Sequence, residues 1–312
     1  MAATKSVQNS IDWVRPFLNW ANLAIGVHEE PAFTSASQTL QTIMGPPFIW
    51  PWNRSNTFFL TNIGQQDYQV YIPTFGFLET ASIELCGQIT SVTVASNVAT
   101  FTANNGFSSL PNQGQGVPVT ITGCETSAYN STFPLVSATA TTFTVNITTP
   151  DNTESEAGAL AVAGPSTQIN IKWEALSEDR ALDKPGFIST QMSDESGVNF
   201  TFRLMPVPEN YYRVNLIFQQ APTQISDVSN LWGIPDQLQY IYNYFFAFFM
   251  FDYFDDPRAA RYRQLAVAAL LSRQSGLSLT ARNLFLGNFL DLMNEEEESA
   301  DSTKQGSQGR GI

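Results

Sequence analysis

In the first fifty residues, apolar side chains recur three and four positions apart, which is the spacing of one face of an α-helix. This spacing predicts a helix over residues 6–24 and another over residues 31–44, ended by Gly-Pro-Pro at 45–47. Residues 48–54, Phe-Ile-Trp-Pro-Trp-Asn-Arg, hold too much proline for regular structure and too many aromatics for a free loop. We predict that this segment packs against the helices.

Alternation of apolar and polar residues then predicts β-strands, in two groups separated by about eighty residues. Pro206 and Pro208 separate the last two strands and predict a hairpin with a rigid turn. The predicted strands are 57–63, 68–72, 81–85, 167–173, 186–191, 198–204 and 211–218.

Between these groups the composition changes to Thr, Ser, Val, Ala, Asn and Gly, from residue 87 to about residue 164. Short alternating runs separated by turn residues are typical of a small β-sandwich or barrel. Pro118 places its run at a sheet edge, because proline cannot donate to a ladder. The alternating runs are 89–94, 98–102, 117–122 and 142–147.

Helical patterns return near the C-terminus. Residues 236–254 are apolar on every side and predict a buried helix that is too short to span a membrane. Asp255, Asp256 and Pro257 mark the start of the next helix, which Gly276 ends. Residues 278–293 carry a dense apolar set that predicts an arm docked on a neighbouring subunit or portal; the alternative is a third helix packed within the chain.

These patterns together predict an α+β fold. A helical host domain with a small antiparallel sheet comprises residues 1–85 and 166–294. An inserted all-β domain, an Ig-like sandwich or a barrel, comprises residues 86–165. Residues 295–312 form an acidic, Gly/Ser-rich tail that we expect to be disordered.

The composition points to assembly. Of the 312 residues, 12% are aromatic and only 14% are charged, and protein interfaces are likewise enriched in aromatics and depleted of charge. We expect burial in an assembly, and the alternative is a large monomer with a Phe-rich core. The net charge of −13 argues against binding nucleic-acid phosphates, which requires a basic surface.

No pattern indicates catalysis. His28 is the only histidine, which excludes a histidine metal site or HExxH motif within one chain, and no Gly-Lys-Ser/Thr phosphate loop occurs. Three carboxylate pairs each have a plainer role on a helix face, in a turn or at a helix cap. We therefore predict no enzyme activity, no catalytic or metal-binding residue and no cofactor. The pairs are Asp179 with Asp183, Asp194 with Glu195, and Asp255 with Asp256.

The two cysteines, Cys86 and Cys124, are too few for a disulfide framework. They predict two buried free thiols, and a single bridge between them is the alternative.

Short motifs along the chain carry a family resemblance. They are Leu40-Gln-Thr-Ile43, Trp50-Pro-Trp-Asn-Arg54, Gln66-Asp-Tyr68, Val207-Pro208, Pro235-Asp236 and Arg282-Asn-Leu-Phe-Leu-Gly-Asn288. Their content and order resemble the head-to-tail adaptor proteins of tailed bacteriophages, often called tail tubular protein A. The resemblance covers residues 1–85 and 166–294. The inserted segment departs from the plain adaptor pattern and resembles Ig-like or barrel modules of phage virion proteins.

The resemblance implies a structural virion protein: a homo-oligomeric ring of about twelve copies that joins the portal to the tail around the DNA exit channel. The implied partners are the portal protein, the tail nozzle or tail tube protein, possible tail fibres, and genomic DNA that passes without specific binding. No membrane is involved. The implied location is the head-tail junction of the virion, after assembly in the bacterial cytoplasm. The alternative is a receptor- or carbohydrate-binding or fibre-attachment protein that uses the inserted domain.

Aromatic and basic residues outside the insert are the candidate assembly contacts. The arginines of the helix at 255–274 can bind an acidic partner or pair with Asp255, Asp256 and Glu295. The candidates are Trp50, Trp52, Arg54, Arg258, Arg261, Arg263, Arg282, Leu284, Phe285 and Phe289.

Overall fold

The computed structural model describes residues 5–18, 29–46, 48–156, 158–172, 181–192, 197–222, 225–227, 229–230, 233–272, 275–277 and 282–283. The chain divides into two compact units. Unit 1 comprises Met1–Arg54 and Gln219–Ile312, and unit 2 comprises Ser55–Phe218.

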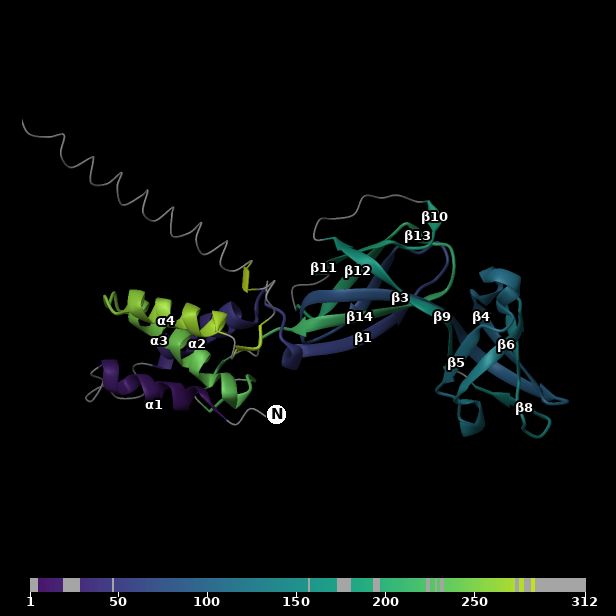
Figure 1. Ribbon diagram of the computed structural model, residues 1–312, viewed down its shortest axis with the longest axis horizontal. Coiled ribbons are helices and arrows are strands. Elements are labelled where there is room, and N and C mark those ends of the chain that lie inside the picture. The colour runs from purple at the N-terminus through teal and green to yellow at the C-terminus, as the bar shows by residue number, and fades with distance from the viewer. Residues whose placement is uncertain are drawn as a thin grey trace, which may run out of the picture. The chain divides into compact units, whose positions relative to one another are not determined.

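Unit 1 is helical, and its central helix packs against the other three (Figure 1). This helix, α3, is apolar on most of its surface because it carries Phe245-Phe-Ala-Phe-Phe-Met-Phe251, and it is therefore surrounded. The Ser10 hydroxyl donates a hydrogen bond to the Asn243 side-chain oxygen over 2.7 Å and joins α1 to α3. The elements are α1 (Val7–Leu18), α2 (Glu29–Met44), η3 (Pro51–Asn53), η7 (Asp236–Leu238), α3 (Gln239–Tyr253) and α4 (Ala259–Leu271).

The aromatic segment after α2 is part of this core. Phe48 and Trp50 are 2% and 1% exposed and belong to the same hydrophobic cluster as α2 and α3. The Trp50 indole N–H donates to the Ile43 carbonyl over 2.7 Å, and the Trp50 amide donates to the Gln219 side chain over 3.0 Å. The prediction that this segment packs against the helices is confirmed.

Unit 2 is built from strands. Seven of them, in the order β1-β14-β3-β9-β11-β12-β2, surround one hydrophobic core. The rings of Tyr68 and Phe202, on the paired strands β2 and β12, stack on Phe59 of β1 at 5.0 and 5.7 Å, so β1 faces this pair across the core. The strands are β1 (Arg54–Leu60), β2 (Asp67–Tyr71), β3 (Phe75–Ala95), β9 (Leu160–Lys172), β11 (Phe187–Met192), β12 (Asn199–Met205) and β14 (Tyr212–Gln220).

A second set of strands closes on itself. The pairings run β3-β4-β7-β6-β5-β9 and return to β3, all antiparallel, which makes a six-stranded barrel. The barrel has its own core, in which Phe101 stacks on Phe143 with ring centroids 4.9 Å apart. The further strands are β4 (Val98–Asn105), β5 (Pro118–Thr122), β6 (Thr132–Ala138), β7 (Thr142–Asn146) and β8 (Asn152–Ser155), which pairs with β3.

Two long strands serve both cores. Leu85 packs against both hydrophobic clusters, and the β3–β9 register shifts between Ile83 and Leu85, as at a β-bulge. A bulge bends a strand, so it allows β3 to leave one core and enter the other. Short elements complete unit 2: η4 (Phe107–Ser109), η5 (Pro111–Gly114), η6 (Ser127–Tyr129), and β10 (Leu182–Asp183) paired with β13 (Val207–Pro208).

The predicted fold class is wrong. The described residues form mainly β structure, with a twelve-stranded mixed sheet, and not a helical domain with a small antiparallel sheet. The error arose because β3 runs unbroken over 21 residues, of which only 81–85 and 89–94 were predicted as strand. The predicted domain boundaries at 85/86 and 165/166 lie inside β3 and β9. The division into a host domain and an inserted domain stays a prediction.

Two local predictions also fail. The predicted hairpin does not form, because β12 pairs with β11 and β2 whereas β14 lies between β1 and β3. Pro118 does not mark an edge, since β5 pairs with both β6 and β9. Pro118 is the first residue of β5, a position where a missing N–H is tolerated.

We predict that the barrel can be removed. Leu85 and Ala163 are paired neighbours, so a short Gly/Ser linker in place of residues 88–163 closes a small gap. The remaining pairs, such as Ala81 with Ile169, keep the other core of unit 2 intact. The variant should retain its far-UV signal per remaining residue and one cooperative melt of the remaining sheet. A molten, dye-binding product would show that the two cores depend on each other.

None of the described helices has the length and hydropathy that crossing a membrane requires.

Candidate functional site

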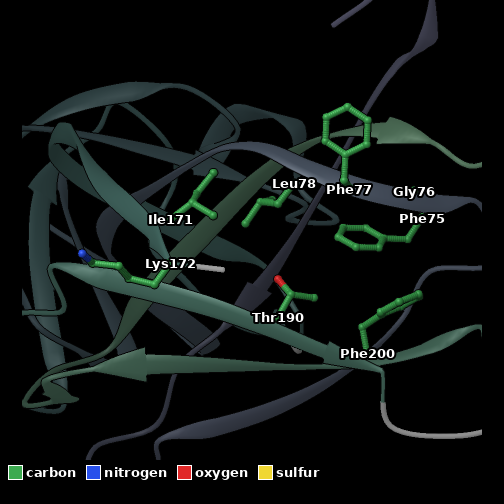
Figure 2. A pocket seen from close by; sticks show the side chains of 8 residues that line it. All are labelled: Phe75, Gly76, Phe77, Leu78, Ile171, Lys172, Thr190 and Phe200. Atoms are coloured by element: carbon green, nitrogen blue, oxygen red, sulfur yellow. The ribbon is translucent and has the colours of Figure 1, made fainter. Parts of the chain in front are cut away.

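Unit 2 contains an apolar cavity of about 200 Å³, shown in Figure 2. The Lys172 side chain extends away from the aromatic end of the cavity, and its ammonium lies 5.2 Å from the centre of the Phe187 ring. The buried Thr190 hydroxyl has no hydrogen-bond partner among the described residues. Lys172 is the one ionisable side chain in the lining, which contains no carboxylate. The cavity therefore suits an apolar group better than acid–base chemistry. Its lining is Phe75, Gly76, Phe77, Leu78, Ile171, Lys172, Thr190 and Phe200.

Both thiols are buried, free and unreactive. Burial raises the pKa of Cys86 to about 12 and that of Cys124 to about 11, so neither forms a thiolate at neutral pH. Of the two alternatives, the structure has free thiols and no bridge. Among the described residues, no group of three His, Cys, Asp or Glu side chains could hold a metal ion.

The turn between α3 and α4 exposes two aromatic rings. Tyr253 and Phe254 are 59% and 41% exposed, with ring centroids 5.2 Å apart in an edge-to-face arrangement. Asp252 and Asp255 flank them and are exposed, and neither carboxylate bonds to a described residue. We call residues 252–255 the acidic aromatic tip. Such exposed aromatics are typical of interface anchors.

Arg258 holds this turn in place. Its guanidinium donates to the Asp256 carboxylate, with an Nη2–Oδ2 distance of 2.6 Å, and to the Phe17 carbonyl of α1. It also lies 4.6 Å from the centre of the Phe251 ring. The arginines at the start of α4 were predicted either to bind an acidic partner or to pair with acids of the same chain. Arg258 pairs within the chain, with Asp256 and not with Asp252 or Asp255 of the tip.

The Arg258–Asp256 pair gives a testable pKa. Hydrogen bonds from Arg258 lower the pKa of Asp256 to about 2. A lowered carboxyl pKa stabilises the fold above the ordinary value near 3.8, and this contribution is lost as the pH falls toward 2. In an Arg258→Gln variant we expect the pKa of Asp256 to rise toward 3.8. A pH titration of the Asp256 carboxyl carbon by NMR measures this change. An unchanged midpoint would mean that Arg258 does not hold this carboxylate in solution.

The other candidate contacts are scattered. Trp50 is in the core of unit 1, and Trp52 is half-buried beside it with ring centroids 5.5 Å apart. Arg54 is exposed at the start of β1, Arg261 is exposed on α4, and Arg263 lines a shallow hollow together with Asp252 and Asp255. Arg282 is half-buried. Leu284, Phe285, Phe289 and Glu295, like most of the predicted arm at 278–293, lie outside the described residues.

A second exposed surface, in unit 2, was not predicted. Phe58 of β1 and Ile217 of β14 are 46% and 39% exposed, and the Arg213 guanidinium lies 4.3 Å from the centre of the Phe58 ring. The Arg213 Nε is buried without a hydrogen-bond partner, and no described carboxylate forms an ion pair with Arg213. We call Phe58, Arg213 and Ile217 the Arg213 face. Alternation along β14 places Arg213 and Ile217 on one face, but the sequence pattern does not tell whether that face is covered.

Comparison with known proteins adds no assignment: no family model matches the chain, and no curated protein matches it significantly.

Proposed function

We propose that the protein is a structural component of a phage virion, with no catalytic role, that forms an oligomeric ring and joins the portal to the tail. One observation carries the proposal: each unit presents large apolar side chains to solvent. Among the described residues they are Phe17, Tyr253, Phe254 and Leu265 in unit 1, and Phe58, Ile63, Tyr71, Leu182 and Ile217 in unit 2. Exposed apolar side chains that lie together in one patch are typical of surfaces that another chain covers.

The two surfaces differ in chemistry, which favours a ring. A two-fold dimer uses one self-complementary patch, whereas a head-to-tail ring needs two different patches on each subunit. The tip carries carboxylates and the Arg213 face carries a guanidinium, so they are a pair of the second kind.

The charge suits a conduit for DNA. A net charge of −13 repels phosphates, so DNA can pass through such a ring without being retained. The proposed partners are accordingly the portal, the tail nozzle or tail tube protein, possible tail fibres and passing genomic DNA. The proposed location is the head-tail junction of the virion.

The barrel offers less support for carbohydrate or receptor binding. Phe101, Phe107, Tyr129 and Phe143 are at most 2% exposed in its core, and Phe133 is half-buried. Among the described residues of the barrel, no large apolar side chain is exposed. Sugar binding by stacking needs an exposed ring, so we do not propose it.

Measuring the size of the purified protein tests the proposal. The chain has a mass of 34.5 kDa, and light scattering should give a large multiple of this value at high protein concentration or with the portal present. Negative-stain images of the same sample should show rings with a central channel. A monomer under both conditions would contradict the proposal.

A further inference from the structure

We propose that the acidic aromatic tip of one copy docks on the Arg213 face of a second copy. This inference rests on the proposed ring and assigns the contact that builds it. The observations that carry it are two unpaired carboxylates beside exposed rings on one surface, and an arginine without a carboxylate beside exposed apolar side chains on the other.

The Arg213 face is suited to receive an acidic group. The Arg213 guanidinium lies over the Phe58 ring, 4.3 Å from its centre, and its buried Nε has no hydrogen-bond partner among the described residues. An arginine fork binds a carboxylate with two parallel hydrogen bonds, stronger than neutral ones. Glu84 of β3 accepts a hydrogen bond from Asn215 of β14 over 3.1 Å and forms no ion pair with Arg213. The carboxylate that Arg213 lacks can therefore come from another chain.

The tip supplies the complementary groups. Asp255, in the turn that follows α3, has a backbone φ of +50° in the left-handed region, and its side chain is exposed. Tyr253 and Phe254 beside it can cover Phe58 and Ile217, which removes apolar surface of both copies from water. Arg258 fixes the following residue, Asp256, so little ordering is required on docking.

In the proposed ring the tip of each copy meets the face of the next copy, so the contact is head to tail. Such a contact adds a further copy at each end until the ring closes. It follows that damage to the tip in one copy and to the face in another leaves one intact contact between them. The size of the wild-type assembly distinguishes a ring from a two-fold pair that uses the same contact twice, because such a pair stops at two copies.

Charge reversal tests the proposal. Arg213→Glu and the double variant Asp252→Lys/Asp255→Lys should each abolish rings and give monomers in light scattering. An equimolar mixture of the charge-removing variants Arg213→Gln and Asp252→Asn/Asp255→Asn should give dimers that grow no further. The first copy supplies an intact tip and the second an intact face, while the damaged tip and the damaged face carry no opposite charges. Combining all three charge reversals in one chain should restore larger assemblies in part. Lys184→Glu makes the same charge change as Arg213→Glu, and Asp12→Lys makes one of the two charge changes of the tip variant; both are at exposed positions elsewhere and should leave rings unchanged.

The outcomes separate the two proposals. Rings that persist in both variants would overturn the proposed contact and leave the proposed function standing, while a wild-type chain that never assembles would overturn both. If Arg213→Glu melts earlier than the wild type, Arg213→Gln replaces it, since glutamine removes only the charge. It should weaken self-association at least about tenfold; an unchanged association would contradict the contact.

Discussion

Replacing Trp50 with alanine is expected to lower the free energy of unfolding of unit 1 by roughly 3–5 kcal/mol, which is the usual cost of deleting a buried aromatic side chain. Trp50 is 1% exposed and packs with Phe48 and Trp52 beside α2. The substitution also leaves the Ile43 carbonyl without its hydrogen bond from the indole. Denaturant unfolding followed by the helical far-UV signal measures the loss.

Two control variants separate packing from hydrogen bonding. Trp50→Phe keeps most of the ring volume and should cost less than Trp50→Ala, while Trp52→Ala, at a half-buried position, should also cost less. A loss below about half a kcal/mol for Trp50→Ala would place this side chain outside the core, because only surface substitutions are that mild.

The second large effect is expected in the barrel. Phe143 is fully buried, stacks on Phe101 at 4.9 Å and meets the edge of Phe107 at 5.3 Å. Phe143→Ala should therefore cost roughly 3–5 kcal/mol through the cavity and the lost ring contacts. Because the barrel has its own core, amide hydrogen exchange should increase in β4, β6 and β7 far more than in β11, β12 and β14.

The matched control is Phe133→Ala, which removes the same side chain at a half-buried position of β6 and should change exchange only slightly. Equal increases in both sets of strands after Phe143→Ala would show that unit 2 unfolds as a single cooperative body.

Local patterns along the chain predicted the positions of most elements. The helical spacing of residues 31–44 corresponds to α2 (Glu29–Met44), and the alternation at 186–191 and 198–204 corresponds to β11 and β12. These elements were predictable because one face of each contacts a core. The spacing of apolar residues along the chain therefore indicates both the type of element and its buried face. The strand β6 (Thr132–Ala138) was missed because Pro134 interrupts its alternation.

The arrangement of the strands was not predictable in the same way. Composition changes at residue 87, yet the backbone of β3 continues to Ala95. Composition indicates whether side chains are buried or exposed. It does not indicate which strands, distant in sequence, pair with each other, as β5 does with β6 and β9. The Arg213 face was missed for the same reason, because Arg213 and Phe58 are 155 positions apart and meet only in the folded sheet.

The central claim is that this chain forms a ring at the junction between portal and tail. The most direct measurement is electron microscopy of the purified protein mixed with the portal protein of the same virus. The account predicts rings of this chain stacked coaxially on the portal, with the two channels aligned. Attachment at another site on the virion, or no binding to the portal at all, would contradict it.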